Sequence, residues 1–377
     1  MYGFGSGNNI EPWLEFFEKH HQVYQLTFVC RKFQLNHHDF PHIRIVETKS
    51  LYFIGFSLWK RLMMEKSDVV YIQGLYDYLI ILQLLLLSRA KLRVVNIWNN
   101  RNFRKAAFEN KKFWQIPLYR IIFALTNRFY FTWYGTYTDF GELFPSQASK
   151  RLIQPWGIRN KIIESTPVAG SEFARQYLDS LRADELFLFW PENMSPDEHI
   201  DVLLEALRKV PGKFKLRVLI FCGHQKTEND YSKYLHSLID RYHLNGVELV
   251  LGNYLPYSDI MAFWARADLS VKLSTKDQLS NGIIEALFFG TPMVLNNWMP
   301  YKMLAEKGLH VHLTDLDPES LARCLTPIMD NLSRDRNYYA KEGDTNNRII
   351  REKFNFDRNI GILMSDLEQI IQESGKK

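Results

Sequence analysis

The chain has 377 residues, of which 46% are hydrophobic and 14% aromatic, and it carries a net charge of +5. This length is too great for one small domain and suits two domains with substantial cores. Three widely separated cysteines exclude a disulfide-stapled scaffold and favour a reducing, cytoplasmic compartment. The longest apolar run, between Leu79 and Leu87, is too short to cross a bilayer and predicts a buried helix.

The first half of the chain predicts alternating strands and helices. Helical patterns cover 11–19 and 52–64. Short apolar runs mark the strands, at 23–29, 43–46, 69–72, 92–97, 130–133 and 152–154. Such alternation is typical of a parallel, doubly wound sheet. A polar stretch from about 159 to 184 then predicts a linker.

A basic, aromatic segment lies between residues 101 and 128. It holds seven Lys and Arg residues against one acid, Glu109, and six aromatic residues are interleaved with them. Such a segment is suited to an anionic membrane surface. An ordinary helix with a solvated basic face and a buried aromatic face is the alternative. Nucleic acid would also attract it, but we expect no nucleic-acid partner.

The second half of the chain repeats the alternation. Ser195 and Glu198 have the spacing of a capping box that opens a helix. The predicted strands are 186–190, 216–222, 247–251, 269–273, 293–296 and 310–313. Two alternating units joined by a linker predict an α/β protein with two Rossmann-like, doubly wound domains facing each other across a cleft.

The most informative motif begins at Asp277 in a loop that follows a strand. A helix is predicted to start near Asn281 and to carry Glu285, and Gly290 and Pro292 end it. Open α/β sheets bind ligands at the carboxyl ends of their strands, and a helix N-terminus attracts phosphate. Ionised carboxylates accept hydrogen bonds from the hydroxyls of a sugar or ribose. The motif therefore predicts a site for such a ligand.

This motif resembles the E-x7-E signature of the retaining group 1 family of GT-B glycosyltransferases. Seven residues separate Asp277 from Glu285-Ala286-Leu287, and Gly290-Thr291-Pro292 follows, whereas family members carry Glu at the first position. The resemblance implies a GT-B fold over nearly the whole chain. We expect an acceptor-side domain at 1–165, a linker at 166–185, a nucleotide-sugar domain at 186–350 and a returning C-terminal helix at 351–377.

The resemblance also assigns candidate site residues. Glu285 would hold the ribose hydroxyls of the donor, and Asp277 would contact the donor sugar. Other donor-side candidates are Gly252, Asn253, Lys272, Ser280, Asn281 and Gly282. Acceptor-side candidates are Gly5, Ser6, Gly7, Trp98 and Asn99.

The chain also departs from the family pattern at its phosphate clamp and at its first strand. The clamp of Arg and Lys is absent, because Glu192-Asn193 stands where Gly-Arg is expected and Glu198 stands where Lys is expected, and Lys272 is one candidate to replace it. The first strand would have to end before Gly3, so it is either vestigial or incomplete.

The cluster of His37, His38, Asp39 and His42 could bind metal but lacks a fixed ligand spacing, so we expect a solvated loop and no metal.

The family resemblance implies a metal-independent hexosyltransferase that uses no cofactor. It would move a sugar from a nucleotide-sugar to a glycan or lipid-linked acceptor with retention, in bacterial surface polysaccharide synthesis. The protein would be cytoplasmic or peripheral on the inner membrane, with residues 101–128 at the inner leaflet. The absent clamp leaves two alternatives, a binding or scaffold subunit with reduced catalysis and a nucleotide-sugar epimerase or hydrolase.

Overall fold

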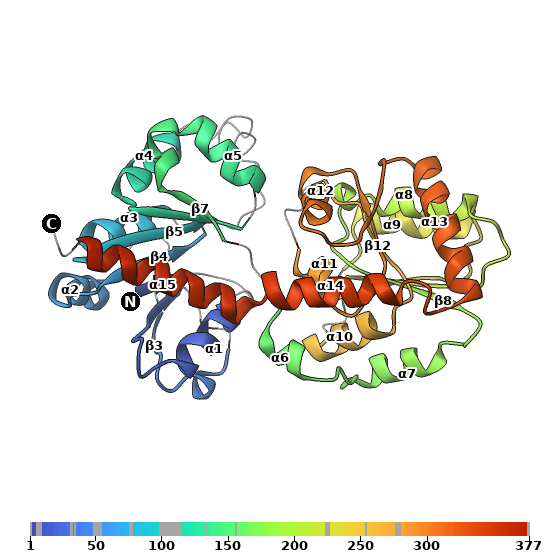
Figure 1. Cartoon of the computed structure of the whole chain (residues 1–377), viewed down its shortest axis with the longest axis horizontal. Coiled ribbons are helices and arrows are strands. Elements are labelled where there is room, and N and C mark those ends of the chain that lie inside the picture. The colour runs from blue at the N-terminus through green and yellow to red at the C-terminus, as the bar shows by residue number, and fades with distance from the viewer. Residues whose placement is uncertain are drawn as a thin grey trace. The chain divides into compact units, whose positions relative to one another are not determined.

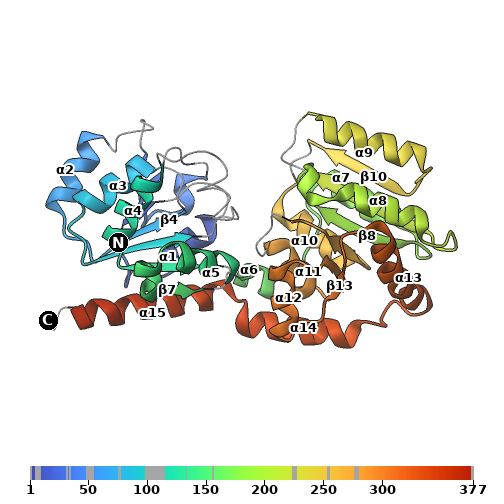
Figure 2. The ribbon, with the colours of Figure 1, turned by 90° about the horizontal axis from the view of Figure 1, so that it is seen from above.

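The computed structural model describes residues 2–4, 10–30, 33, 35–47, 55–74, 78–97, 115–132, 134–154, 157–222, 227–252, 255–275 and 280–374. The chain divides into two compact units, which we describe separately. Unit 1 comprises Met1–Trp156 and Phe356–Lys377, and unit 2 comprises Gly157–Asn355. Figures 1 and 2 show the elements of each unit.

Unit 1 is built on a parallel sheet with the strand order β3-β2-β1-β4-β5-β6-β7. Its strands are β1 (Tyr2–Phe4), β2 (Thr27–Cys30), β3 (Arg44–Glu47), β4 (Val69–Gln73), β5 (Leu92–Ile97), β6 (Arg128–Phe131) and β7 (Arg151–Ile153). Although β1 is short, it pairs with β2 on one side and with β4 on the other. The strand therefore includes Gly3 and Phe4, whereas the sequence predicted that it ends before Gly3. A run of three residues is too short to be recognised as a strand from its own sequence, and pairing on both sides stabilises it.

Helices cover both faces of this sheet. One apolar core packs α2 (Phe56–Met64), α3 (Tyr78–Leu87), α4 (Gln115–Leu125) and α5 (Tyr134–Leu143) against one face. The other core packs α1 (Glu11–Lys19) and the C-terminal helix α15 (Phe356–Ser374) against the opposite face, as Figure 1 shows. Within the described ranges, no helix is both long enough and apolar enough to cross a membrane.

Unit 2 has two three-stranded parallel sheets, β10-β9-β8 and β11-β12-β13, joined side by side. A bridge between Leu188 and Leu269 joins β8 to β11, and the Ser270 hydroxyl donates to the Phe189 carbonyl at 2.7 Å. The strands are β8 (Leu186–Pro191), β9 (Leu216–Cys222), β10 (Val247–Leu251), β11 (Ser270–Lys272), β12 (Met293–Asn296) and β13 (His312–Thr314). The combined order is that of a doubly wound sheet, with its switch point between β8 and β11.

The helices of unit 2 also lie on both faces. One core holds α8 (Ile200–Lys209), α9 (Asp230–Arg241) and α13 (Pro318–Arg334). The second core holds α7 (Glu172–Ser180), α10 (Tyr257–Arg266), α11 (Asn281–Phe288), α12 (Met299–Glu306) and α14 (Ala340–Lys353). The stretch 159–184, expected to be an irregular linker, contains α7 and the short α6 (Asn160–Glu164). Both units thus have the predicted Rossmann-like architecture.

The predicted capping box at Ser195 does not form. Residues Pro196–Glu198 make a single 3₁₀ turn, and the Ser195 side chain caps nothing. His199 then takes a left-handed conformation with φ of 54°, and α8 begins one residue later. Glu198 is buried and its carboxylate faces Lys272, so it does not reach back to the helix N-terminus. An interaction with β11 has overridden the local sequence signal.

Candidate functional site

The switch point of unit 2 brings charged residues together at the carboxyl ends of its strands. Glu192 directly follows β8, and Lys272 is the last residue of β11. At a switch point the connections leave neighbouring strands toward opposite faces, which opens a crevice where doubly wound sheets bind ligands. Unit 2 therefore places the region predicted from the Asp277–Glu285 motif next to the strands that frame this crevice.

Lys272 lies among acids at this point. Its ammonium pairs with the Glu192 carboxylate and lies 4.0 Å from Oε2 of Glu198. Lys272 and Glu198 are each only 7% exposed. A charge buried to this degree needs an opposite charge beside it. Glu192 and Glu198 therefore hold Lys272 in place and compensate its charge.

A histidine stands beside this ion-pair group. Nε2 of His199 lies 3.1 Å from the Thr275 hydroxyl, and the Thr275 amide donates to the Asp197 carbonyl at 3.1 Å. Burial lowers the pKa of His199, against the opposing effect of Asp201. This imidazole is therefore neutral at neutral pH, and it adds no positive charge for a phosphate.

Glu285 lies one turn into α11 and points into the unit. The side chain is 5% exposed, and its Oε1 accepts a hydrogen bond from the hydroxyl of Tyr257, the first residue of α10. The Arg159 guanidinium lies over the Tyr257 ring, 5.1 Å from its centroid. Three segments far apart in sequence therefore meet at this carboxyl group.

The environment of Glu285 shifts its titration strongly. Burial raises the pKa of Glu285 to about 7, and the Tyr257 hydroxyl, the Arg159 charge and the Trp264 indole act in the opposite direction. Burial prevails because it removes the water that stabilises the ionised form. Groups with such shifted pKa values are concentrated at functional sites. Hydroxyl donors from a ligand would supply the stabilisation that the carboxylate lacks.

The N-terminus of α11 is suited to an anion. Ser280 is the N-cap residue but its side chain accepts no capping hydrogen bond from the helix, and Asn281 at the first position is exposed. A Cβ added at Gly282 would come no closer than 3.7 Å to Ser280 Oγ or Trp264 Cζ2. Packing within the protein therefore does not require glycine here. The first amides of a helix bind phosphate when the backbone is left accessible.

The remaining predicted site residues fall into two groups. Gly252 ends β10 with φ of 78°, and its amide donates to the Cys222 carbonyl at 3.2 Å, so glycine is needed there for the turn. The others lie outside the described residues and stay predictions; they are Gly5, Ser6, Gly7, Trp98, Asn99, Asn253 and Asp277. The structure therefore brings Glu285 near Tyr257, and Lys272 near Glu192 and Glu198.

The basic segment 101–128 is described only from residue 115 onward. There α4 has Tyr119 and Phe123 buried and Arg120 exposed. This part is an amphipathic helix packed on the sheet of unit 1. Residues 101–114 lie outside the described ranges, so membrane contact through them stays a prediction.

Two residues of the site were not identified from sequence. Tyr257 and Arg159 carry no motif, and each contacts the Glu285 region only through the fold. Tyr257 could have been found from its position in the sequence. It starts a helix that follows a glycine turn at the carboxyl end of β10. That position alone places a side chain at the ligand-binding edge of the sheet.

Comparisons with known proteins agree with this architecture. Residues 179–344 match the family model described as glycosyl transferases group 1. Anabaena Alr3699/HepE, solved in complex with UDP and glucose, has a TM-score of 0.73 at 16% identity, covering 98% of this chain and 99% of that one. A glycosyltransferase from Rickettsia africae ESF-5 has a TM-score of 0.75 at 13% identity, covering 98% of each chain. WaaG, a glycosyltransferase involved in lipopolysaccharide biosynthesis, has a TM-score of 0.62 at 13% identity, covering 93% of this chain and 95% of that one.

These likenesses confirm the predicted GT-B fold, since they extend over nearly all of both chains. The family match confirms the predicted resemblance to the group 1 glycosyltransferases. A comparison with curated protein sequences gave no match.

Proposed function

We propose that this chain transfers a hexosyl unit from a nucleotide-sugar with retention of configuration, because it has the GT-B fold and its residues 179–344 match the group 1 glycosyl transferases. The acceptor would be a hydroxyl of a glycan or of a lipid-linked sugar. The observation that carries the proposal is the buried Glu285 carboxyl beside the N-terminus of α11, because it joins a hydroxyl-binding group to an anion-binding one.

Each group at this site has a separate role in the proposal. Glu285 accepts hydrogen bonds from the ribose of the donor, and Tyr257 holds the carboxyl in position. The amides of Asn281 and Gly282 face the diphosphate, whose charge the helix dipole stabilises. Asp277 contacts the hydroxyls of the donor sugar. These groups are fixed before reaction, so they stabilise the leaving charge without reorganising.

The proposed step balances without a protein base or a metal ion. The bond between the anomeric carbon and the diphosphate breaks, and the diphosphate leaves with both electrons. The acceptor oxygen bonds to the same face of that carbon, and its proton passes to an oxygen of the leaving phosphate. Glycine backbone at Gly5 and Gly7, with Trp98 and Asn99, would receive the acceptor. No residue of the chain is consumed.

The comparisons guide the choice of donor and acceptor. Anabaena Alr3699/HepE was also solved with UDP-glucose, at a TM-score of 0.70 and 17% identity over 100% of this chain and 99% of that one, so UDP-hexoses are the first donors to test. The likeness to WaaG supports an acceptor of the lipid-linked surface polysaccharide class. In that setting the protein would work in the cytoplasm or on the inner membrane, with residues 101–128 at the leaflet.

One observation favours a second candidate function, that of a binding subunit with reduced catalysis. Glu192 and Glu198 compensate the charge of Lys272 at the switch point, where a diphosphate would need uncompensated positive charge. Like charges disfavour a diphosphate at this position. A protein of this kind would bind a glycan or a partner chain without turning over a nucleotide-sugar.

A product assay separates these functions. The protein would be incubated with UDP-, GDP-, dTDP-, ADP- and CDP-sugars, with and without a lipid-linked acceptor, and released nucleotide and glycosyl products would be measured. We expect nucleotide release to require the acceptor and to fall strongly in Glu285→Gln, while Glu319→Gln, a surface control on α13, keeps full activity. Release without acceptor would indicate a hydrolase, a converted donor sugar an epimerase, and no release with any donor the binding subunit.

A further inference from the structure

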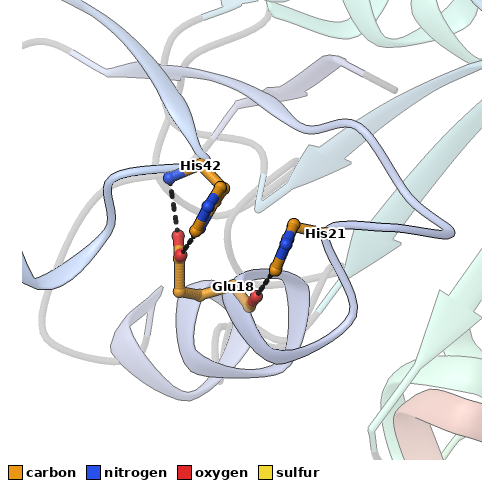
Figure 3. Close-up of side chains that lie close together, drawn as sticks. All are labelled: Glu18, His21 and His42. Carbon is orange, nitrogen blue, oxygen red and sulfur yellow. Dashed lines mark hydrogen bonds and ion pairs between the residues drawn. The ribbon is translucent and has the colours of Figure 1, made fainter.

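A second group of chemistry-bearing side chains lies in unit 1, away from the sheet edge. Glu18 is in the last turn of α1, His21 follows three residues later, and His42 lies in the loop before β3. One carboxylate oxygen of Glu18 and one nitrogen from each imidazole lie within 4.8 Å of one another. Figure 3 shows the three side chains turned toward each other. We call them the Glu18–His21–His42 cluster.

The Glu18 carboxylate is held in a fixed orientation. Its Oε2 accepts a hydrogen bond from the backbone amide of His42 at 3.1 Å, and its Oε1 faces Nδ1 of the His42 ring. The loop before β3 is therefore tied to the end of α1 through one carboxylate. Because Oε2 is anchored on the backbone, Oε1 is left as the oxygen that faces the His42 ring.

The His21 ring is oriented by the same residue. Its Nδ1 lies 2.8 Å from the Glu18 carbonyl oxygen, which can only accept, so Nδ1 carries the proton and Nε2 carries the lone pair. A backbone carbonyl that accepts from one imidazole nitrogen is the usual way in which the other nitrogen is prepared as a metal ligand. The structure thus supplies an orienting contact as well as the candidate ligands.

The two imidazoles are stacked face to face. Their centroids are 3.7 Å apart and their planes differ by 8°. The rings therefore lie close enough for one nitrogen of each to approach the same ion. Zinc ligands in a tetrahedral site lie about 3.4 Å apart, which rotation of these partly exposed side chains can reach.

The neighbouring histidines are engaged elsewhere. His20 donates to the Phe16 carbonyl at 2.8 Å and stacks on the Phe16 ring, and the His37 ring packs 4.6 Å from that of Phe33. The sequence grouped His42 with His37 and His38, but the fold places His42 against His21 and Glu18. The expectation of a solvated loop without metal considered His42 only with its neighbours in the chain, and the fold adds Glu18 and His21 to it.

We propose that the Glu18–His21–His42 cluster binds one divalent transition-metal ion, zinc in the first instance, with Oε1 of Glu18 and a nitrogen of each imidazole as ligands. Imidazole and carboxylate ligands suit zinc and its neighbours rather than magnesium or calcium. Three protein ligands leave a fourth position for water. The ion would fasten the end of α1 to the loop before β3 and so stabilise unit 1. The proposal is independent of the sugar-transfer reaction.

Metal binding is tested by titrating chelator-treated full-length protein with zinc chloride in a calorimeter. We expect one equivalent per chain in the wild type. Removing a ligand in His21→Ala or His42→Ala should weaken zinc binding by at least roughly 10-fold, and Glu18→Gln should weaken it by roughly 10–100-fold. His38→Ala removes an exposed imidazole from the same loop and should leave the affinity unchanged.

A second measurement keeps the test decisive if a variant is destabilised. Cobalt chloride would be used as a spectroscopic probe on the folded wild type, where the visible absorption of a cobalt ion bound to imidazole reports the ligand set. The proposal is supported by a saturable cobalt spectrum that zinc abolishes. Absence of stoichiometric zinc binding, or equal binding by the wild type and both histidine variants with folded circular dichroism spectra, would overturn it.

Discussion

Two sets of carboxylates at the candidate site of unit 2 are held by opposite kinds of partner. Glu285 is paired with the neutral hydroxyl of Tyr257, whereas Glu192 and Glu198 face the ammonium of Lys272. Glu285 and Glu198 are buried to a similar degree, at 5% and 7% exposure. The two carboxyl groups therefore differ in the charge of their partner and not in their burial.

This difference determines what each group can do. A cation compensates a buried carboxylate directly, so Lys272 and the two carboxylates that face it interact favourably without a ligand. A hydroxyl compensates only in part, so Glu285 retains a raised pKa and gains from further donors. We therefore assign ligand binding to the Glu285 group and a structural role to the Lys272 group. The predictions below test that assignment.

The largest expected effect comes from removing the cation of the Lys272 group. Lys272→Met keeps the length of the side chain but removes the ammonium from the buried Glu198 and the partly buried Glu192. Breaking a buried pair in this way costs about 3–5 kcal/mol. Urea unfolding should show this loss, and adding Glu192→Gln should recover part of it. If Lys272→Met is as stable as the wild type, the pair is not holding the switch point together.

Ionisation of Glu285 should make the free energy of unfolding depend on pH. The pKa of Glu285 is raised from 4.5 in the unfolded chain to about 7 in the folded one, so its stabilising contribution is complete below pH 4.5 and is lost as pH rises through 7. The loss amounts to about 3 kcal/mol. Glu285→Gln cannot ionise and should lack this component. Between pH 4.5 and 8, the free energy of unfolding of the wild type should therefore fall relative to that of Glu285→Gln, so that the two values converge or cross.

Tyr257 should contribute less, through its single hydrogen bond. Tyr257→Phe keeps the ring under Arg159 but removes the donor to Glu285, which costs about 1–3 kcal/mol and raises the pKa of Glu285 further. The cost should be greater at pH 8 than at pH 5, because the ionised carboxylate needs the donor more. Tyr234→Phe on α9, an exposed tyrosine, is the matched control and should change stability little at either pH.

The smallest expected effect on stability, and a clear one on binding, comes from Gly282→Ala. Among the described residues the added methyl meets no atom closer than 3.7 Å, so stability should stay the same or rise by less than about 1 kcal/mol. If the amides of α11 face a diphosphate, the methyl will obstruct it and nucleotide affinity will fall. Gly212→Ala, where nothing lies within 4 Å, serves as the control. Unchanged affinity in Gly282→Ala would exclude close approach of the ligand at this helix.

Much of the fold could be predicted from local sequence patterns. The alternation of strands and helices indicated two doubly wound units, and α11 ends before Gly290, whose φ is 82°. An N-cap also forms locally at Asp317, since its side chain accepts from the Ser320 amide at 2.8 Å. These features depend on residues close together in the chain, so the sequence carries them directly.

The parts that could not be predicted depend on contacts between distant residues. Tyr257 and Glu285 meet only because α10 and α11 pack together. Glu198 turns inward because Lys272, on another strand, provides its charge partner. The three-residue β1 was underestimated because strand pairing on both sides, and not its own sequence, stabilises it. In each case tertiary interactions outweigh local preference.

The central claim is that Glu285 belongs to a nucleotide-sugar site, and a thermal-shift panel tests it most directly. The wild type and Glu285→Gln would be melted with UDP, GDP, dTDP, ADP and CDP at pH 8. A ligand bound to the folded state raises the melting temperature by mass action. We predict that one nucleotide stabilises the wild type and that Glu285→Gln loses most of that shift, while Glu319→Gln retains it. No shift with any nucleotide, or an equal shift in Glu285→Gln, would contradict the claim.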